Sequence, residues 1–378
     1  MFYESKIKVK YLDEKEYKSC YITVNLMDVA DEEEISKIYD SVYKLLQENK
    51  MQIVYEKIFG RSDFEDIMFL IRKNTTTKYR IKNAPALYLE GLPIYDAPMS
   101  GIQIFALQPN DLINIAYINM SDSVGITLIT GATDALHILL NTEPVVDKDI
   151  EYRDLFKNVK HAISNNNYLV TDIARTWIYL NNINNYYENF NQARRDFFNY
   201  VEIDYSVNSS ALPASTCVGG RGNNSSSCMQ ILCVNKKDDN LAVTRVYNDL
   251  QNEAEGDQYK FKSTFSRGLI LERKNVVELQ ISGTASINKS GETIHVNDPY
   301  KQIEYTLKNI ENILKKANMD FEDLCVSTCF FKEPQYYAFY KELKKKLKIE
   351  NIPCNHMVGD ICRTDLLFEF DGIAVKQK

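Results

Sequence analysis

The sequence lacks an apolar run of the roughly 18 residues that a membrane-spanning helix requires. Its N-terminal stretch, MFYESKIKVKYLDEKEYK, is charged throughout and has no apolar signal-peptide core. We therefore expect a cytoplasmic protein without a membrane partner. The formal net charge of −7 gives no basic footprint for nucleic acid, so no nucleic-acid partner is expected. An anionic substrate would need a local group of arginines.

Metal and nucleotide signatures are also scarce. The 378 residues include eight cysteines and only four histidines, which are scattered. Neither Cys228/Cys233 nor Cys325/Cys329 has C-x2-C spacing, and no GK[ST] follows the glycines near Arg221. Without a secretion signal the cysteines are expected to be reduced thiols. The sequence predicts no metal site and no cofactor.

An ordinary soluble composition remains, with 44% hydrophobic and 26% charged residues. Residues 1 to about 83 indicate mixed helix and strand, including a helix over 31–49 with Asp31 as its N-cap, but they carry no recognisable chemistry. Short strands separated by Gly, Pro and Asp turns follow from residue 84. The length suits two domains.

An internal repeat organises the rest of the chain. LITGATD (128–134) matches QISGTAS (280–286), and the helix tyrosines Tyr187 and Tyr337 are offset by 337 − 187 = 150 residues. The repeat predicts an α/β (α+β) fold of two β-α-β-α-β units, with mixed sheets and helices packed on one face. We place the domains at 1–237, the N-terminal extension plus the first unit, and 238–378.

The closing strand of the second copy, predicted over 362–375, carries a carboxylate on its apolar side. Period-2 alternation puts Glu369 on one face with Leu367 and Ile373. A buried carboxyl has a raised pKa and can donate a proton near neutral pH. The alternative is an exposed glutamate on an edge strand. The first copy has Cys228 at the aligned position.

Several short motifs, in this order, resemble the chorismatase family, whose members are similar to a Rid-like (reactive-intermediate deaminase-like) unit duplicated in one chain. They are YLEGLP (88–93), ARTWIY (174–179), FNQAR (190–194), FSRG (265–268), SGTAS (282–286) and CRTDLLFE (362–369). The resemblance implies cleavage of the enolpyruvyl ether of chorismate, a small dicarboxylate, to pyruvate and 3-hydroxybenzoate or a dihydroxycyclohexadiene carboxylate. Simple Rid-like units form threefold rings, so either a monomer or a homotrimer is expected.

The resemblance and the residues together predict a catalytic pair. Glu369 is the general acid, and Cys362 resembles the cysteine of members that make 3-hydroxybenzoate. We expect Cys362 to shape the ring pocket and not to act as a nucleophile, since only Arg363 is near in sequence to lower its pKa. Ala285, with Thr284 beside it, is expected at the substrate ring, although an alanine there favours the diene product.

Arginines are the expected partners of the two substrate carboxylates, because a guanidinium binds a carboxylate bidentately. Arg194 lies at i+4 from Phe190 on the buried side of its helix. Arg267, Arg221 and Arg363 are the further candidates. For each of them a structural salt bridge is the alternative, with Asp365 as the possible partner of Arg363.

Two other functions stay open. A Rid-like imine or enamine hydrolase is disfavoured, because the carboxylate-binding arginine of that family is replaced by Cys354 and Asn355. A non-catalytic protein that binds a small carboxylate is the other alternative.

Overall fold

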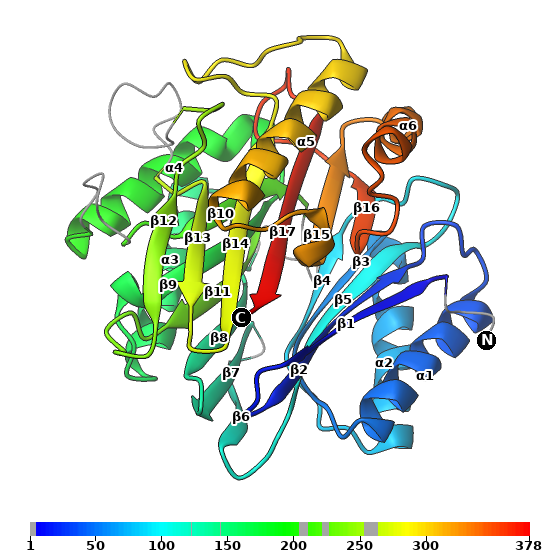
Figure 1. Ribbon diagram of the computed structural model, residues 1–378, viewed down its shortest axis with the longest axis vertical. Helices are drawn as coiled ribbons and strands as arrows, with labels where there is room; N and C mark the ends of the chain where they lie inside the picture. The colour runs from blue at the N-terminus through cyan, green and yellow to red at the C-terminus, as the bar shows by residue number, and fades with distance from the viewer. Residues whose placement is uncertain (1–4, 122, 144, 204–210, 221–226, 253–263) are drawn as a thin grey trace.

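The computed structural model describes residues 5–121, 123–143, 145–203, 211–220, 227–252 and 264–378. Its strands form three sheets, one for each successive third of the chain (Figure 1). The predicted two units are therefore wrong: the fold has three Rid-like units, and the first comprises residues that the sequence assigned mainly to an extension.

The first unit has the sheet order β1-β2-β5-β3-β4. Its elements are β1 (Ile7–Asp13), β2 (Lys18–Asn25), α1 (Glu32–Glu48), β3 (Gln52–Gly60), α2 (Glu65–Tyr79), β4 (Ala86–Glu90) and β5 (Met99–Gln108). Asp31 caps α1, as predicted, by accepting a hydrogen bond from the backbone N–H of Glu33.

The second unit repeats this order as β7-β8-β11-β9-β10 and adds β6 at the edge beside β7. Its elements are β6 (Ile113–Ser121), β7 (Val124–Gly131), β8 (Ala135–Asn141), α3 (Lys148–Ser164), β9 (Ile173–Leu180), α4 (Ile183–Tyr200), β10 (Ala214–Gly219) and β11 (Ser227–Val234).

The third unit has the same order as β13-β14-β17-β15-β16, with β12 added at the edge. Its elements are β12 (Ala242–Val246), β13 (Gly268–Glu272), β14 (Val276–Ala285), α5 (Pro299–Lys316), β15 (Leu324–Phe331), α6 (Tyr337–Leu347), β16 (Cys354–Val358) and β17 (Phe368–Gln377). The closing strand therefore starts at Phe368, six residues after the predicted start at Cys362.

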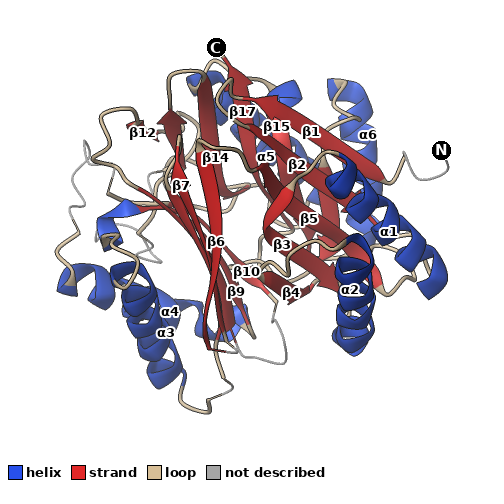
Figure 2. Ribbon diagram, turned by 90° about the horizontal axis from the view of Figure 1, so that it is seen from below, coloured by secondary structure: helices blue, strands red, loops and turns tan. Residues whose placement is uncertain are grey.

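Each sheet is buried on both faces. Three hydrophobic clusters lie between a sheet and the helix pair of its own unit, and a fourth is shared by strand residues of all three units. Figures 1 and 2 show the helix pairs on the outside of the molecule. The prediction of helices on one face of each sheet is confirmed, and the other face packs against the neighbouring units.

The units meet in a ring in which the closing-strand side of one unit faces the third and fourth strands of another. Asp371 on β17 accepts hydrogen bonds from Thr216 (2.7 Å) and Arg175 (3.2 Å) of the second unit. Gln103 on β5 donates to Thr328 (3.1 Å) of the third unit. These contacts create pockets between units.

The predicted domain boundary at 237/238 falls between β11 and β12, where the second unit ends. Its assignment as a domain boundary stays a prediction. Within the described residues, every helix is too short or too polar to cross a membrane. The cytoplasmic location also stays a prediction.

Candidate active site

A pocket lies between the second and third units, and the space of about 480 Å³ within and at its mouth includes open solvent. Helix α4 and strand β10 form one side, and β14, β17 and the loop before β17 form the other. The pocket is lined by Tyr187, Arg194, Ser215, Cys217, Phe265, Arg267, Gly283, Ala285, Ile287, Cys362, Arg363, Leu366 and Glu369. It brings together six of the eight residues predicted for the site.

Glu369 lies at the second position of β17, between Ala285 on β14 and Phe330 on β15. Only 4% of its surface is exposed. Burial, reinforced by the negative charge of Asp371, raises the pKa of Glu369 to about 8, although Arg175 and two pocket arginines oppose the shift. The carboxyl is therefore mostly protonated at neutral pH, as a general acid requires.

Gly283 makes the space for this carboxyl. A Cβ atom at position 283 would lie 2.1 Å from Oε1 of Glu369. No side chain larger than hydrogen fits there while Glu369 keeps its place. The glycine of the SGTAS motif thus has a steric role in the site.

The residues that remove water from Glu369 differ from the predicted ones. Leu367 lies before the strand and is only half-buried, whereas Leu366 lines the pocket. Ile373 does share the face of Glu369, but it lines a different cavity. The prediction for Leu367 failed because strand alternation does not extend into the turn that precedes β17.

Arg194 projects from α4 into the pocket and is only 3% exposed. It donates a hydrogen bond to Oδ1 of Asn191 at 2.6 Å, and its Nε–H has no partner among the described residues. No carboxylate of the described residues pairs with it, so the salt-bridge alternative fails within that part of the chain. A buried guanidinium with a free donor is suited to an anionic ligand.

Arg267 and Arg363 line the same pocket and also bond to nearby chain segments. Arg267 donates to the backbone oxygen and the side-chain oxygen of Asn252, both at 2.9 Å. Arg363 donates to the backbone oxygen of Gly291 at 2.9 Å. Their side chains are thereby held in fixed orientations at the pocket.

Cys362 and Ala285 line the pocket, but Thr284 does not. The hydroxyl of Thr284 donates to the backbone oxygen of Ser282 at 2.9 Å, and its residue is fully buried. Along β14, Gly283 and Ala285 therefore face the pocket while the residue between them points away. Arg221 lies outside the described residues.

Burial raises the pKa of the Cys362 thiol to about 12, and the Glu369 charge adds to the effect. The thiol is therefore neutral and a poor nucleophile at physiological pH. The predicted role of Cys362 in shaping the pocket stays a prediction.

Sequence reasoning missed the residues that the second unit contributes around Arg194. Ser215 and Cys217 alternate along β10, and Tyr187 lies two turns before Arg194 on α4. The alternating pattern of PASTCVG would have identified the strand face. Nothing in the sequence shows that this face meets Glu369.

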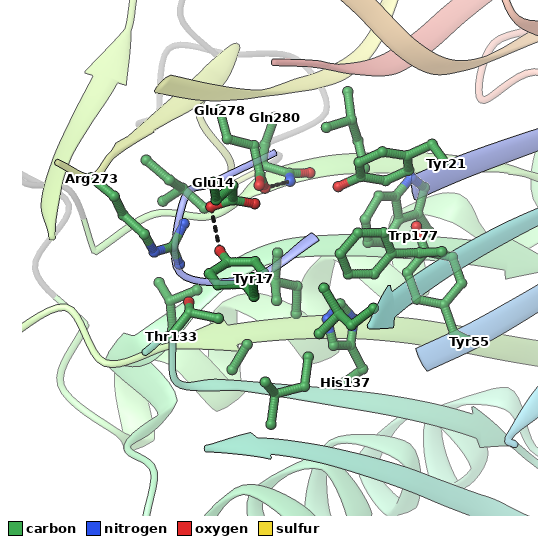
Figure 3. Close-up of a pocket in the computed structure, with 18 residues that line it drawn as sticks. Glu14, Tyr17, Tyr21, Tyr55, Thr133, His137, Trp177, Arg273, Glu278 and Gln280 are labelled. Atoms are coloured by element: carbon green, nitrogen blue, oxygen red, sulfur yellow. Dashed lines mark hydrogen bonds between the residues drawn. The ribbon is translucent and has the colours of Figure 1, made fainter. Parts of the chain in front are cut away.

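A second cavity lies where the three sheets meet, and Figure 3 shows it from within. Two pairs of its polar side chains bond to each other: Tyr17 donates to Glu14, and Gln280 donates to Glu278 at 2.5 Å. Nδ1 of His137 and Oε1 of Gln280 have no partner among the described residues. Of the eight residues predicted for the site, none lines this cavity. The pocket with Glu369 is the better candidate, because an acid and several arginines converge there.

A family model described as Endoribonuclease L-PSP matches residues 262–376. The crystal structure of a chorismatase superposes with a TM-score of 0.64 at 16% identity and covers 85% of this chain and 93% of its own. The chain has a chorismatase-like fold with a Rid-type L-PSP domain.

Smaller structures match about one unit. RidA from the Antarctic bacterium Psychrobacter covers 35% of this chain and 98% of its own, at 17% identity and a TM-score of 0.28. Yeast Mmf1 covers 36% and 99%, at 17% identity and a TM-score of 0.28. A search of curated protein sequences gives no match.

Strand pairing identifies the positions equivalent to Glu369 in the other units of this chorismatase-like chain. Cys228 pairs with Tyr179 on β9 as Glu369 pairs with Phe330 on β15, which confirms the alignment made from the sequence. In the first unit, Gly101 takes this position opposite Phe59. Among the three closing strands, only that of the third unit has an acid at this position.

Proposed function

We propose that this protein cleaves the enolpyruvyl ether of chorismate, with Glu369 as the general acid. The observation that carries the proposal is the pocket itself. A buried carboxyl with a pKa of about 8 shares it with Arg194, a buried guanidinium that has a free donor and no carboxylate partner among the described residues.

The chemistry starts when Glu369 gives its proton to the methylene carbon of the enol ether. The double bond supplies the electron pair, and positive charge develops at the ether carbon. Cleavage of the bond between the ring carbon and the ether oxygen then releases pyruvate. The neighbouring ring hydroxyl attacks the carbon that loses the ether oxygen and gives up its proton, which forms an epoxide across the two carbons. The epoxide opens at the carbon that first held the hydroxyl, and the other carbon loses its ring proton. The product is 3-hydroxybenzoate, formed without addition of water, so atoms balance. Capture of the cation by water would give the dihydroxycyclohexadiene acid instead.

The two carboxylates of chorismate match the arginines. Arg194 is the first candidate, with Arg267 and Arg363 as the other lining cations. Each charge-assisted bond to a carboxylate in a buried site is stronger than a neutral hydrogen bond. Guanidinium groups near a developing positive charge are unfavourable, so we place them at the carboxylates and not at the ether carbon.

We propose 3-hydroxybenzoate as the ring product. Cys362, Ala285, Ile287 and Leu366 give the pocket an apolar part that disfavours a water molecule at the ring. The neutral thiol of Cys362 adds bulk there without adding charge. The dihydroxycyclohexadiene acid is the product expected if water reaches the cation.

The test is incubation of the purified protein with chorismate, with separate detection of pyruvate and of the aromatic product. The expected result is equal amounts of pyruvate and 3-hydroxybenzoate. Replacement Glu369→Gln should lower the rate of pyruvate release by about 10²–10⁴-fold, the usual contribution of a general acid. Glu350→Gln, at an exposed position, is the matched control and should retain full activity.

Other results would replace the proposal. Thermal stabilisation by chorismate without pyruvate release would indicate a non-catalytic binding protein. Turnover of an imine with no reaction of chorismate would indicate the hydrolase. Full activity of Glu369→Gln would remove the acid from the mechanism.

A further inference from the structure

A second group of reactive side chains lies in the third unit, between its sheet and α6. Cys329 is on β15, and Cys354 and His356 are on β16. The parallel pairing sets Cys329 directly beside His356, and Cys354 lies two residues earlier on the same strand. All three side chains therefore point to one face of the sheet.

The ligand atoms of these residues converge. The two sulfur atoms are 3.3 Å apart. One sulfur from each cysteine and one ring nitrogen of the histidine all lie within 4.8 Å of one another. In a tetrahedral zinc site, with Zn–S bonds of about 2.3 Å and Zn–N bonds of about 2.0 Å, such ligand atoms are separated by roughly 3.3–3.8 Å. The observed spacing is close to that arrangement.

The cluster is buried and its histidine lacks partners. Cys329, Cys354 and His356 are 0%, 1% and 4% exposed. Neither ring nitrogen of His356 has a hydrogen-bond partner within the described residues. The Tyr340 hydroxyl, on α6 above the cluster, is likewise buried and unpartnered there. Buried polar groups in folded proteins almost always have a partner, so a ligand that binds these groups is favoured.

We propose that Cys329, Cys354 and His356 bind one zinc ion. Two thiolates and a neutral imidazole balance the charge of Zn²⁺, so the complete site is neutral and compatible with a buried position. The Tyr340 ring lies beside the cluster, with its centroid 5.5 Å from that of His356, and we assign its hydroxyl to the fourth position. All three ligand residues are buried, so we assign the site a structural role.

The location gives the site a role. Equivalent strand positions place Cys354 where the second unit has Ser215, and His356 where it has Cys217. Both of those residues line the pocket of Glu369. In the third unit, Cys354 and His356 thus take the strand positions that line the Glu369 pocket in the second unit.

Where the third unit meets the first, Asn355 fills the space next to Gly101, the position equivalent to Glu369. Asn355, between the two β16 ligands, donates to the backbone oxygen of Val24 at 2.7 Å. The first unit has Gly101 where the third has Glu369, and a Cβ atom there would lie 2.1 Å from Nδ2 of Asn355. The metal would join β15 and β16 and stabilise this contact with the first unit.

The experiment starts with the full-length protein, reduced and freed of metal by a chelator. Zinc alone should bind at one ion per chain and raise the melting temperature. Cobalt(II) alone should give the visible bands of tetrahedral coordination and a thiolate-to-cobalt charge-transfer band, which zinc then abolishes. Cys354→Ser and His356→Gln should each weaken zinc binding by more than the roughly 10–100-fold of an outer-shell change.

Cys325→Ser is the matched control, because Cys325 is also a buried cysteine of β15 but is not a member of the cluster. It should bind zinc as the unchanged protein does. If the ligand variants do not fold, the cobalt spectrum of the unchanged protein decides alone. Absence of thiolate-to-cobalt absorption, unchanged zinc affinity in His356→Gln, or a Cys329–Cys354 disulfide in the freshly purified protein would overturn the proposal.

Discussion

Glu369 shows how one position in a strand acquires its chemistry from its surroundings. The residue itself is ordinary, and its pKa of about 8 arises from burial first and from the charge of Asp371 second. Arginines lower the pKa only in part. The same residue type on an exposed strand would titrate near its ordinary pKa of about 4.3 and would be ionised at neutral pH.

The pH dependence of activity follows from this shift. A general acid works only while protonated, so kcat/KM should be constant below a pH of about 8 and should fall tenfold per pH unit above it. Pyruvate release measured from pH 6 to pH 10 checks this. A rate that stays constant through the whole range would contradict the acid role.

The same shift has a consequence for stability. The folded-state pKa of Glu369 lies above the unfolded value, so its protonated form stabilises the folded state. This contribution is complete below the unfolded pKa and is lost as the pH rises through about 8. Glu369→Gln has no such loss. Its melting temperature relative to the unchanged protein should therefore rise between pH 5 and pH 9.

Gly283 tests the geometry of the acid. Gly283→Ala places a Cβ atom 2.1 Å from Oε1 of Glu369, so the carboxyl must move and activity should fall by at least about tenfold. Gly359→Ala is the control, because its Cβ atom would meet only a backbone oxygen at 3.6 Å. Steady-state pyruvate kinetics and melting temperatures of both variants would separate misplacement from unfolding. Equal kinetics in the two variants would contradict the steric role.

At the scale of elements, β17 connects the site to the second unit through a buried ion pair. Asp371 Oδ2 contacts Arg175 at 3.2 Å, and the two side chains are 2% and 0% exposed. Arg175 also donates to Thr216 on β10, at 2.5 Å. The acid of the site and the ion pair thus lie two residues apart on one strand face.

Asp371→Asn should affect both stability and pH dependence. Removing one partner of a buried pair leaves an uncompensated charge, which costs roughly 3–5 kcal/mol. The pH at which activity falls should also decrease, because the charge of Asp371 raises the pKa of Glu369. Asp360→Asn breaks the exposed pair with Lys332 and should cost at most about 1 kcal/mol. Urea unfolding and the pH profile provide the two measurements.

Patterns within a single element gave the reliable predictions. Helix periodicity placed Arg194 on the buried side of α4, and strand alternation placed Ile373 on the face of Glu369. At Leu367 the error arose because strand alternation was extended beyond the strand. At Thr284 it arose because alternation was not applied, although neighbours of Ala285 on a strand must point to the other face. The pairing of Arg175 with Asp371 could not be predicted, because it joins two strands 196 residues apart.

The cluster of Cys329, Cys354 and His356 likewise depends on contact between two strands, which the sequence pattern does not show. Its residues do not have zinc-finger spacing, and a metal was not predicted from the sequence. Only the parallel pairing of β15 with β16 brings Cys329 beside His356. A Cys-x-His pair on a strand is a local signal, but the third ligand comes from another strand.

At the scale of the whole molecule, the first unit is the main feature that the sequence did not reveal. Its seven elements have the order and sheet topology of the other two units. Its sequence, however, has no segment that resembles LITGATD or QISGTAS, the pair on which the repeat was recognised, and it has Gly101 at the position of Glu369. Topology here is retained by hydrophobic patterning alone, which many unrelated sequences share.

The presence of three units in one chain, and not two, changes the expected assembly. Simple Rid-like units need three chains to form a ring, whereas here all three interfaces lie within one chain. Thr127 of the second unit donates to the backbone oxygen of Val54 in the first at 2.6 Å, and Gln103 and Asp371 join the remaining pairs. The surfaces that a trimer would use are therefore already buried.

We accordingly expect a monomer. Light scattering coupled to size-exclusion chromatography should give a mass near the chain mass of 43.7 kDa at all concentrations tested. A homotrimer would give 3 × 43.7 kDa, or about 131 kDa, and would require a surface other than the three interfaces between units. A monomer that retains pyruvate release would further show that the pocket needs no residue from a second chain, because α4, β10, β14, β17 and the segments before β13, after β14 and before β17 line it from one chain.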